Sequence, residues 1–147
     1  HPALFQSAIC AKSPNVYEKS TPQRVQQQEQ QEMKLMSMFF GLIEEAIADQ
    51  SFTLPPGMDM QQVCFSSWSL GYGVISLLAD ELDSCSGRMG LVVERELFNQ
   101  HNLLLDGMRW APLSHEKDYK AGLQKALQEV FGEELAQIKA LGRELNF

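Results

Sequence analysis

Apolar side chains recur at intervals of three and four residues along most of the chain, as at Met36, Phe40, Ile43 and Ile47. This spacing places them on one face of a helix, and no alternating run of β-branched residues between hairpin turns competes with it. The pattern therefore predicts an all-α fold, a bundle of about five helices in one domain spanning residues 1–147.

Residues that cap or break helices set the expected boundaries. Thr21 can cap a helix through its hydroxyl, and Pro22 suits the first helical position because an N–H has no helical partner there. The segment Pro55-Pro56-Gly57 separates this helix from the next one. We expect helices at about 2–11, 22–49, 59–82, 88–108 and 114–145.

The junction between the last two expected helices is rich in residues that punctuate helices. Gly107 can take the left-handed conformation that ends a helix, and Pro112 prevents a helical restart before it. Ser114 can then cap the final helix through its hydroxyl. We therefore expect the fourth helix to end near Met108 and the fifth to begin at Ser114.

The third expected helix has a face of small residues. Ser67 and Gly71 lie four positions apart on it. Glycine inside a helix costs about 1 kcal/mol relative to alanine, so Gly71 and Gly73 indicate that another backbone or a ligand comes close. The later helices also carry more apolar surface than a monomer of this size would bury, which predicts a homodimer. The expected interface residues are Ser67, Gly71, Gly73, Leu97 and Leu104.

Charge and cysteine content narrow the class of protein. The chain has 12 basic and 19 acidic residues and a formal net charge of -7, which predicts that this chain alone binds DNA poorly. Cys10, Cys64 and Cys85 are odd in number and lack C-x-x-C spacing, which favours reduced thiols in a cytoplasmic protein. No apolar run is long enough to span a membrane, so no membrane association is expected.

The histidines do not form a recognisable metal motif. A diiron bundle needs Glu-x-x-His pairs, but Phe98 and Pro112 stand three residues before His101 and His115. No serine or cysteine lies in a nucleophile turn, and no glycine-rich loop follows a strand. We therefore expect no metal, no cofactor and no enzymatic activity.

The chain holds 7 methionines and 8 phenylalanines, together with 3 tyrosines and 2 tryptophans. Flexible thioethers and flat rings make adaptable walls for apolar ligands, although the same side chains are typical of a filled core. Charged residues are scarce on these faces, so an apolar or aromatic effector fits better than a sugar or nucleotide. His101 is either a polar contact to that effector or a histidine satisfied within the helix packing. The expected ligand-binding residues are Phe5, Met36, Phe40, Phe65, Trp68, Tyr72 and His101.

Three segments resemble the C-terminal effector-binding and dimerisation domain of the tetracycline-repressor (TetR) family of bacterial transcriptional regulators. They are Lys19–Arg24, Trp68–Gly73 and Asp106–Ser114, with Trp110, Pro112 and Leu113 in the last. The resemblance implies a TetR-like helical bundle, a homodimer, and a small-molecule effector that changes DNA affinity by a population shift. It also implies a longer parent protein, because DNA would be contacted only through an N-terminal helix-turn-helix domain that is absent from this chain.

Two other classes of function stay open. The first is a helical dimerisation or adaptor module without a ligand, and the second is a small cofactor-free enzyme. An enclosed cavity would favour ligand sensing, a filled core would favour the adaptor, and convergent titratable groups would favour the enzyme.

Overall fold

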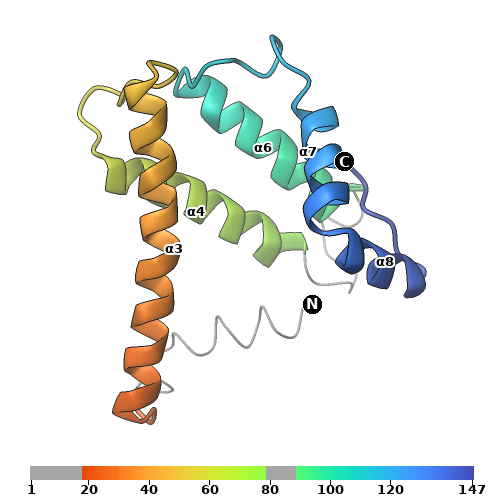
Figure 1. The fold of residues 1–147 in the computed structure, drawn as a ribbon, viewed down its shortest axis with the longest axis horizontal. Coiled ribbons are helices and arrows are strands. Elements are labelled where there is room, and N and C mark those ends of the chain that lie inside the picture. Colours follow the sequence, from red (N-terminus) through yellow and green to blue (C-terminus); the bar gives the residue numbers. More distant parts are fainter. Residues whose placement is uncertain (1–17, 79–88) are drawn as a thin grey trace.

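The computed structural model describes residues 18–78 and 89–147, and every regular element within these ranges is a helix. The all-α expectation is therefore confirmed (Figure 1). The helix expected at 2–11, with Phe5, lies outside the described residues. The helices are α3 (Pro22–Ala48), α4 (Met60–Leu78), α6 (Val93–Gly107), α7 (Tyr119–Val130) and α8 (Gly132–Ala140).

The start of α3 is the one that local signals predict. Pro22 occupies the start of the helix, and the Thr21 side chain accepts a hydrogen bond from the Arg24 N–H at 3.4 Å. In Figure 1, α4 crosses the C-terminal half of α3, and α6 runs alongside α4 on the right of α3. The packing contacts agree, since α4 contacts both α3 and α6. These three helices therefore frame the centre of the described fold.

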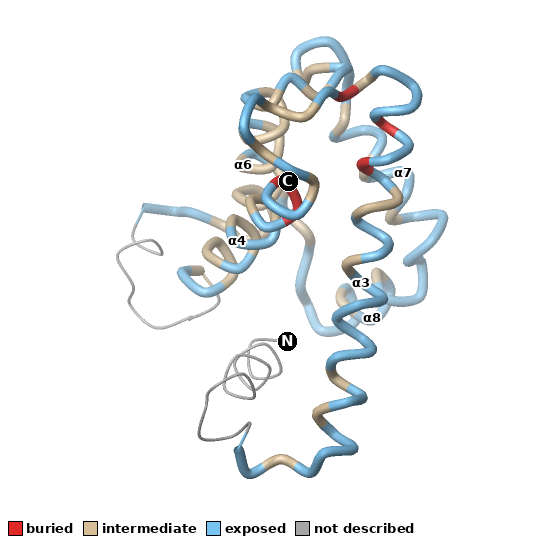
Figure 2. The backbone as a smooth tube through the Cα atoms, turned by 90° about the vertical axis from the view of Figure 1, so that its left-hand side faces the viewer, coloured by how far each residue is buried: buried red, intermediate tan, exposed pale blue. Residues whose placement is uncertain are grey.

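The buried core is small and sits at one end of this arrangement. Figure 2 shows its residues gathered where the end of α3 meets the start of α4. Phe52, in the connection between the two helices, is only 2% exposed. Partly buried side chains, Met36 and Phe40 among them, pack against this cluster. The fully buried apolar residues are Ile43, Ala46, Phe52, Val63 and Cys64.

The fourth expected helix begins later than predicted. The apolar and polar spacing suggested a start at 88, but α6 begins at Val93. Gly90 has φ +68, a conformation outside the right-handed helix, and Val92 is extended. A helix cannot pass through such a residue, so the chain turns at 89–90 and only then enters α6.

The last expected helix is divided in two. A single helix over 114–145 was expected, but α7 ends at Val130 and α8 begins at Gly132. Phe131 lies between them with φ -118 and ψ 31, which departs from helical geometry. The N-terminal end was also misplaced, because Asp118 rather than Ser114 caps α7 by accepting from the Ala121 N–H at 2.9 Å.

The end of α6 differs from the expected glycine stop. Gly107 remains helical, and the left-handed residue is Arg109, with φ 57. The Arg109 N–H donates to the Asp106 carbonyl at 2.9 Å, and the Trp110 N–H donates to the Leu105 carbonyl at 3.0 Å. These two bonds form a Schellman motif, which satisfies the last carbonyls of the helix. The left-handed position therefore falls two residues after the glycine.

Ser114 ties the junction back to α6 instead of capping a new helix. Its N–H donates to Asp106 Oδ1 at 2.8 Å, and its hydroxyl donates to Asp106 Oδ2. These bonds hold the pKa of Asp106 below its ordinary value. The carboxylate is thereby fixed in the last turn of α6, close in sequence to Trp110.

Candidate functional site

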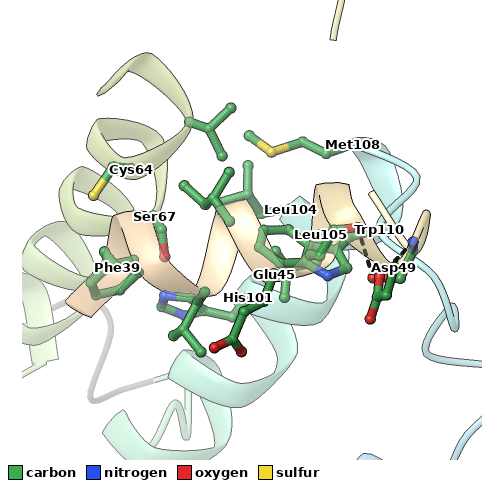
Figure 3. Close-up of a pocket in the computed structure, with 15 residues that line it drawn as sticks. Phe39, Glu45, Asp49, Cys64, Ser67, His101, Leu104, Leu105, Met108 and Trp110 are labelled. Carbon is green, nitrogen blue, oxygen red and sulfur yellow. Dashed lines mark hydrogen bonds between the residues drawn. The ribbon is translucent and has the colours of Figure 1, made fainter. Parts of the chain in front are cut away.

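An apolar cleft of about 490 Å³ lies between α3, α4 and α6 (Figure 3). Its volume falls within the range of about 300–1,000 Å³ that is usual for small-molecule sites. The wall is mostly hydrocarbon, and the cleft is open to solvent on one side. Its apolar lining is Phe39, Leu42, Ile43, Ala46, Val63, Cys64, Leu104, Leu105, Met108 and Trp110.

Small residues on α4 shape this cleft. A Cβ atom placed on Gly71 would lie 3.7 Å from His101 Cε1 and 4.0 Å from Leu97 Cδ2, so α4 and α6 are in contact at this level. One turn earlier, Ser67 lines the cleft and leaves space that a larger side chain would fill. The two helices therefore touch at Gly71, and the cleft opens toward Ser67.

Trp110 closes one end of the cleft. Its indole stacks on the Phe52 ring with centroids 4.4 Å apart and an interplanar angle of 18°. The Ala111 N–H donates to the Ser51 carbonyl at 2.7 Å, which joins the same two segments through the backbone. The junction after α6 is thereby attached to the loop after α3, and the end wall is held by both contacts.

His101 supplies a polar atom in the wall. Its Nδ1 lies 2.8 Å from the Leu97 carbonyl oxygen. A carbonyl can only accept, so Nδ1 carries a hydrogen, and in the neutral imidazole Nε2 keeps a lone pair. Figure 3 shows the imidazole, the Glu45 carboxylate and the Ser67 hydroxyl around the same cavity. A ligand in the cleft could therefore donate a hydrogen bond to either His101 or Ser67.

In the part of the chain that the structure describes, the charged side chains that line the cleft are both acidic. They are Glu45 and Asp49, at the end of α3. The Ser51 N–H donates to Asp49 Oδ1 at 2.8 Å, and hydrogen bonding from Ser51 lowers the pKa of Asp49. Asp49 is therefore ionised at neutral pH. The cleft combines a hydrocarbon wall with a negatively charged rim.

Cys64 contributes packing rather than reactivity. It is buried, and its Sγ lies 3.8 Å from Met36 Sδ. Burial raises the pKa of the Cys64 thiol, so the thiol form is favoured over the nucleophilic thiolate. Within the described ranges, no group of three or more histidine, cysteine or acidic side chains is arranged to hold a metal ion.

The predicted ligand-binding residues occupy different places. His101 lines the cleft, whereas Met36 and Phe40 pack against the buried cluster behind it. Three aromatic residues lie on the opposite face of α4 from Ser67: Phe65, Trp68 and Tyr72, with exposed fractions of 60%, 52% and 40%. The Phe65 and Trp68 rings meet edge to face at 6.0 Å. Glu45, Asp49 and Trp110 were not among the predicted ligand-binding residues.

The predicted interface residues lie mostly between helices of one chain. Gly71 and Leu97 come together in the contact between α4 and α6, and Ser67 and Leu104 line the cleft. A Cβ atom on Gly73 would have no heavy atom of the described residues within 4 Å. The close approach that the small residues predicted is therefore made within the chain, and the homodimer stays a prediction.

Comparison of the chain with family models, with curated proteins and with solved structures finds no match. In the part of the chain that the structure describes, no helix has the length and apolar character needed to cross a bilayer. The chemistry of the cleft is therefore the basis for assigning a function.

Proposed function

We propose that the chain is a ligand-sensing domain and that its cleft binds a small, largely apolar molecule. The observation on which this rests is the half-open cavity of about 490 Å³ with hydrocarbon walls from α3, α4 and α6. Burying about 200 Å² of apolar ligand surface there would contribute on the order of 5 kcal/mol before the costs of association. That is enough for a ligand to be held by hydrophobic contact, with His101 and Ser67 fixing its orientation.

The position of the cleft suits a sensor. A ligand would contact side chains of α3, α4 and α6 together, among them Leu42, Ser67 and Leu104. Any difference in its affinity for two settings of these helices would shift the population between them. The long α3, with 27 residues, could transmit that shift away from the cleft. The cleft is half-open and not the enclosed cavity that was expected of a sensor, but side chains do not fill it, which supports ligand binding over an adaptor without a ligand.

The resemblance of Trp68–Gly73 and Asp106–Ser114 to the TetR family supports a role in transcription regulation. In this proposal the chain forms a homodimer, and the effector alters DNA binding by another part of the regulator. The chain's net charge of -7 is consistent with a part that senses a ligand and does not itself contact duplex DNA.

The test uses 1-decanol as an uncharged apolar probe. Binding should raise the melting temperature of the chain, because a ligand that binds only the folded state stabilises it. It should also change the fluorescence of Trp110, which lines the cleft. No change in either measurement across the soluble range of the alcohol would overturn the proposal.

A further inference from the structure

We propose that the natural ligand is an amphiphilic cation, an apolar body that ends in an ammonium or similar group. The inference rests on the proposed function and names the chemical class that this cleft would take. Among the described residues, the charged side chains lining the cleft are Glu45 and Asp49, and the lining holds no lysine or arginine. Such a cleft suits a ligand whose hydrocarbon part contacts the apolar wall and whose positive charge lies near the two carboxylates.

The two carboxylates are available to a ligand. Glu45 and Asp49 lie four residues apart, one turn from each other at the end of α3. Among the described residues, the salt bridges join other pairs, Arg95 with Glu96 and Lys125 with Glu129. Like charges at this spacing repel each other slightly. A bound cation would relieve that repulsion, whereas an anion would add to it.

The backbone adds negative potential at the same end of the cleft. The C-terminal end of a helix carries a partial negative charge, which a basic residue in the last turn usually offsets. Neither α3 nor α6 has a basic residue in its last turn. Both helices end here, since the Ala111 N–H after α6 donates to the Ser51 carbonyl after α3. Two helix C-terminal ends without a basic residue in the last turn, and two carboxylates, therefore lie in one region, where Arg109 follows the end of α6 by two residues.

The remaining polar and aromatic groups suit the same ligand. The free lone pair of His101 Nε2 and the Ser67 hydroxyl can accept hydrogen bonds from an ammonium N–H. Trp110 lies at the end of the cleft with Asp49 (Figure 3). Indole is the strongest aromatic partner for a cation. The cleft is thus expected to prefer cations to neutral molecules and neutral molecules to anions.

The test compares probes that share one tail and differ in the charge of the head group: decylammonium, 1-decanol and decyl sulfate, each below its micelle concentration. Calorimetric titration of the full chain at low salt should give roughly tenfold tighter binding for the ammonium than for the alcohol, and the weakest binding for the sulfate. Added salt should shrink the gap, because the carboxylates are exposed and their charge is screened.

A matched pair of variants assigns the preference to the cleft. Glu45→Gln should reduce ammonium affinity severalfold and leave 1-decanol binding unchanged. Glu44→Gln, one residue away and not in the lining, should change neither. Equal affinity for ammonium and alcohol in the unaltered chain would overturn the cation preference while leaving the proposed function intact. If no probe binds, the proposed function fails as well.

Discussion

Trp110 lies flat on Phe52, with ring centroids 4.4 Å apart and planes inclined by 18°. The contact joins the junction after α6 to the loop after α3, and Phe52 is 2% exposed. Because Trp110 also lines the cleft, the same stack stabilises the core and forms one end of the site.

We predict that Phe52→Ala lowers the free energy of unfolding by about 3–5 kcal/mol, because it removes a buried ring and its stacking contact with Trp110. Phe65→Ala is the control, since Phe65 is 60% exposed, and it should cost less than about 1 kcal/mol. Urea denaturation measures both. Similar losses in the free energy of unfolding for the two variants would show that the stack of Phe52 on Trp110 does not contribute more to stability than an exposed ring.

We predict that Gly71 tolerates a methyl group and rejects a larger side chain. A Cβ atom there would lie 3.7 Å from His101 Cε1, an ordinary contact distance. Gly71→Ala should therefore stabilise the chain by about 0.5–1 kcal/mol through helix propensity. Gly71→Leu should destabilise it by about 1–3 kcal/mol by forcing α6 away.

Gly73→Leu provides the matched control, because no heavy atom in the described ranges would lie within 4 Å of a Cβ atom there. That variant should not destabilise the chain. The three variants are compared by thermal unfolding, followed by circular dichroism. If Gly73→Leu is as damaging as Gly71→Leu, the contact between α4 and α6 at Gly71 does not limit side-chain size.

We predict a pH-dependent contribution from the bonds between Ser114 and Asp106. These bonds lower the pKa of Asp106 in the folded chain, so their stabilisation is present above the unfolded pKa of about 4. It is lost as the pH falls through the folded pKa. The stability difference between the wild-type chain and Ser114→Ala should therefore be constant near neutral pH and shrink in acid. Urea denaturation from neutral to acidic pH measures it, and a difference that grows in acid would contradict the assignment.

Local signals predicted part of the fold. The start of α3 follows from Thr21 and Pro22, which act within one turn. The break at Phe131 was not predictable from spacing, because Leu127, Leu135 and Ile138 have the spacing of one continuous helical face. In the structure they line one hollow between α7 and α8. Hydrophobic periodicity reports which residues share a face. It does not report whether the backbone between them is continuous.

The site was predicted less well than the fold. The aromatic stripe of Phe65, Trp68 and Tyr72 suggested a pocket, yet α4 turns Ser67 and Gly71 toward α6. Which face of an amphipathic helix meets its neighbour depends on tertiary packing. No role was predicted for Glu45 and Asp49, because acidic residues at a helix end are typical of a solvated surface. Only the convergence of the two helix ends places them beside a cavity.

The most direct test of the central claim is whether blocking the cleft abolishes 1-decanol binding. Ser67→Phe should fill the space between α4 and α6, whereas Ser69→Phe adds the same ring at an exposed position outside the lining. Calorimetric titration should show binding by the wild-type chain and by Ser69→Phe, and at least tenfold weaker binding by a folded Ser67→Phe chain. Undiminished binding by folded Ser67→Phe would place the ligand elsewhere and contradict the assignment of the cleft.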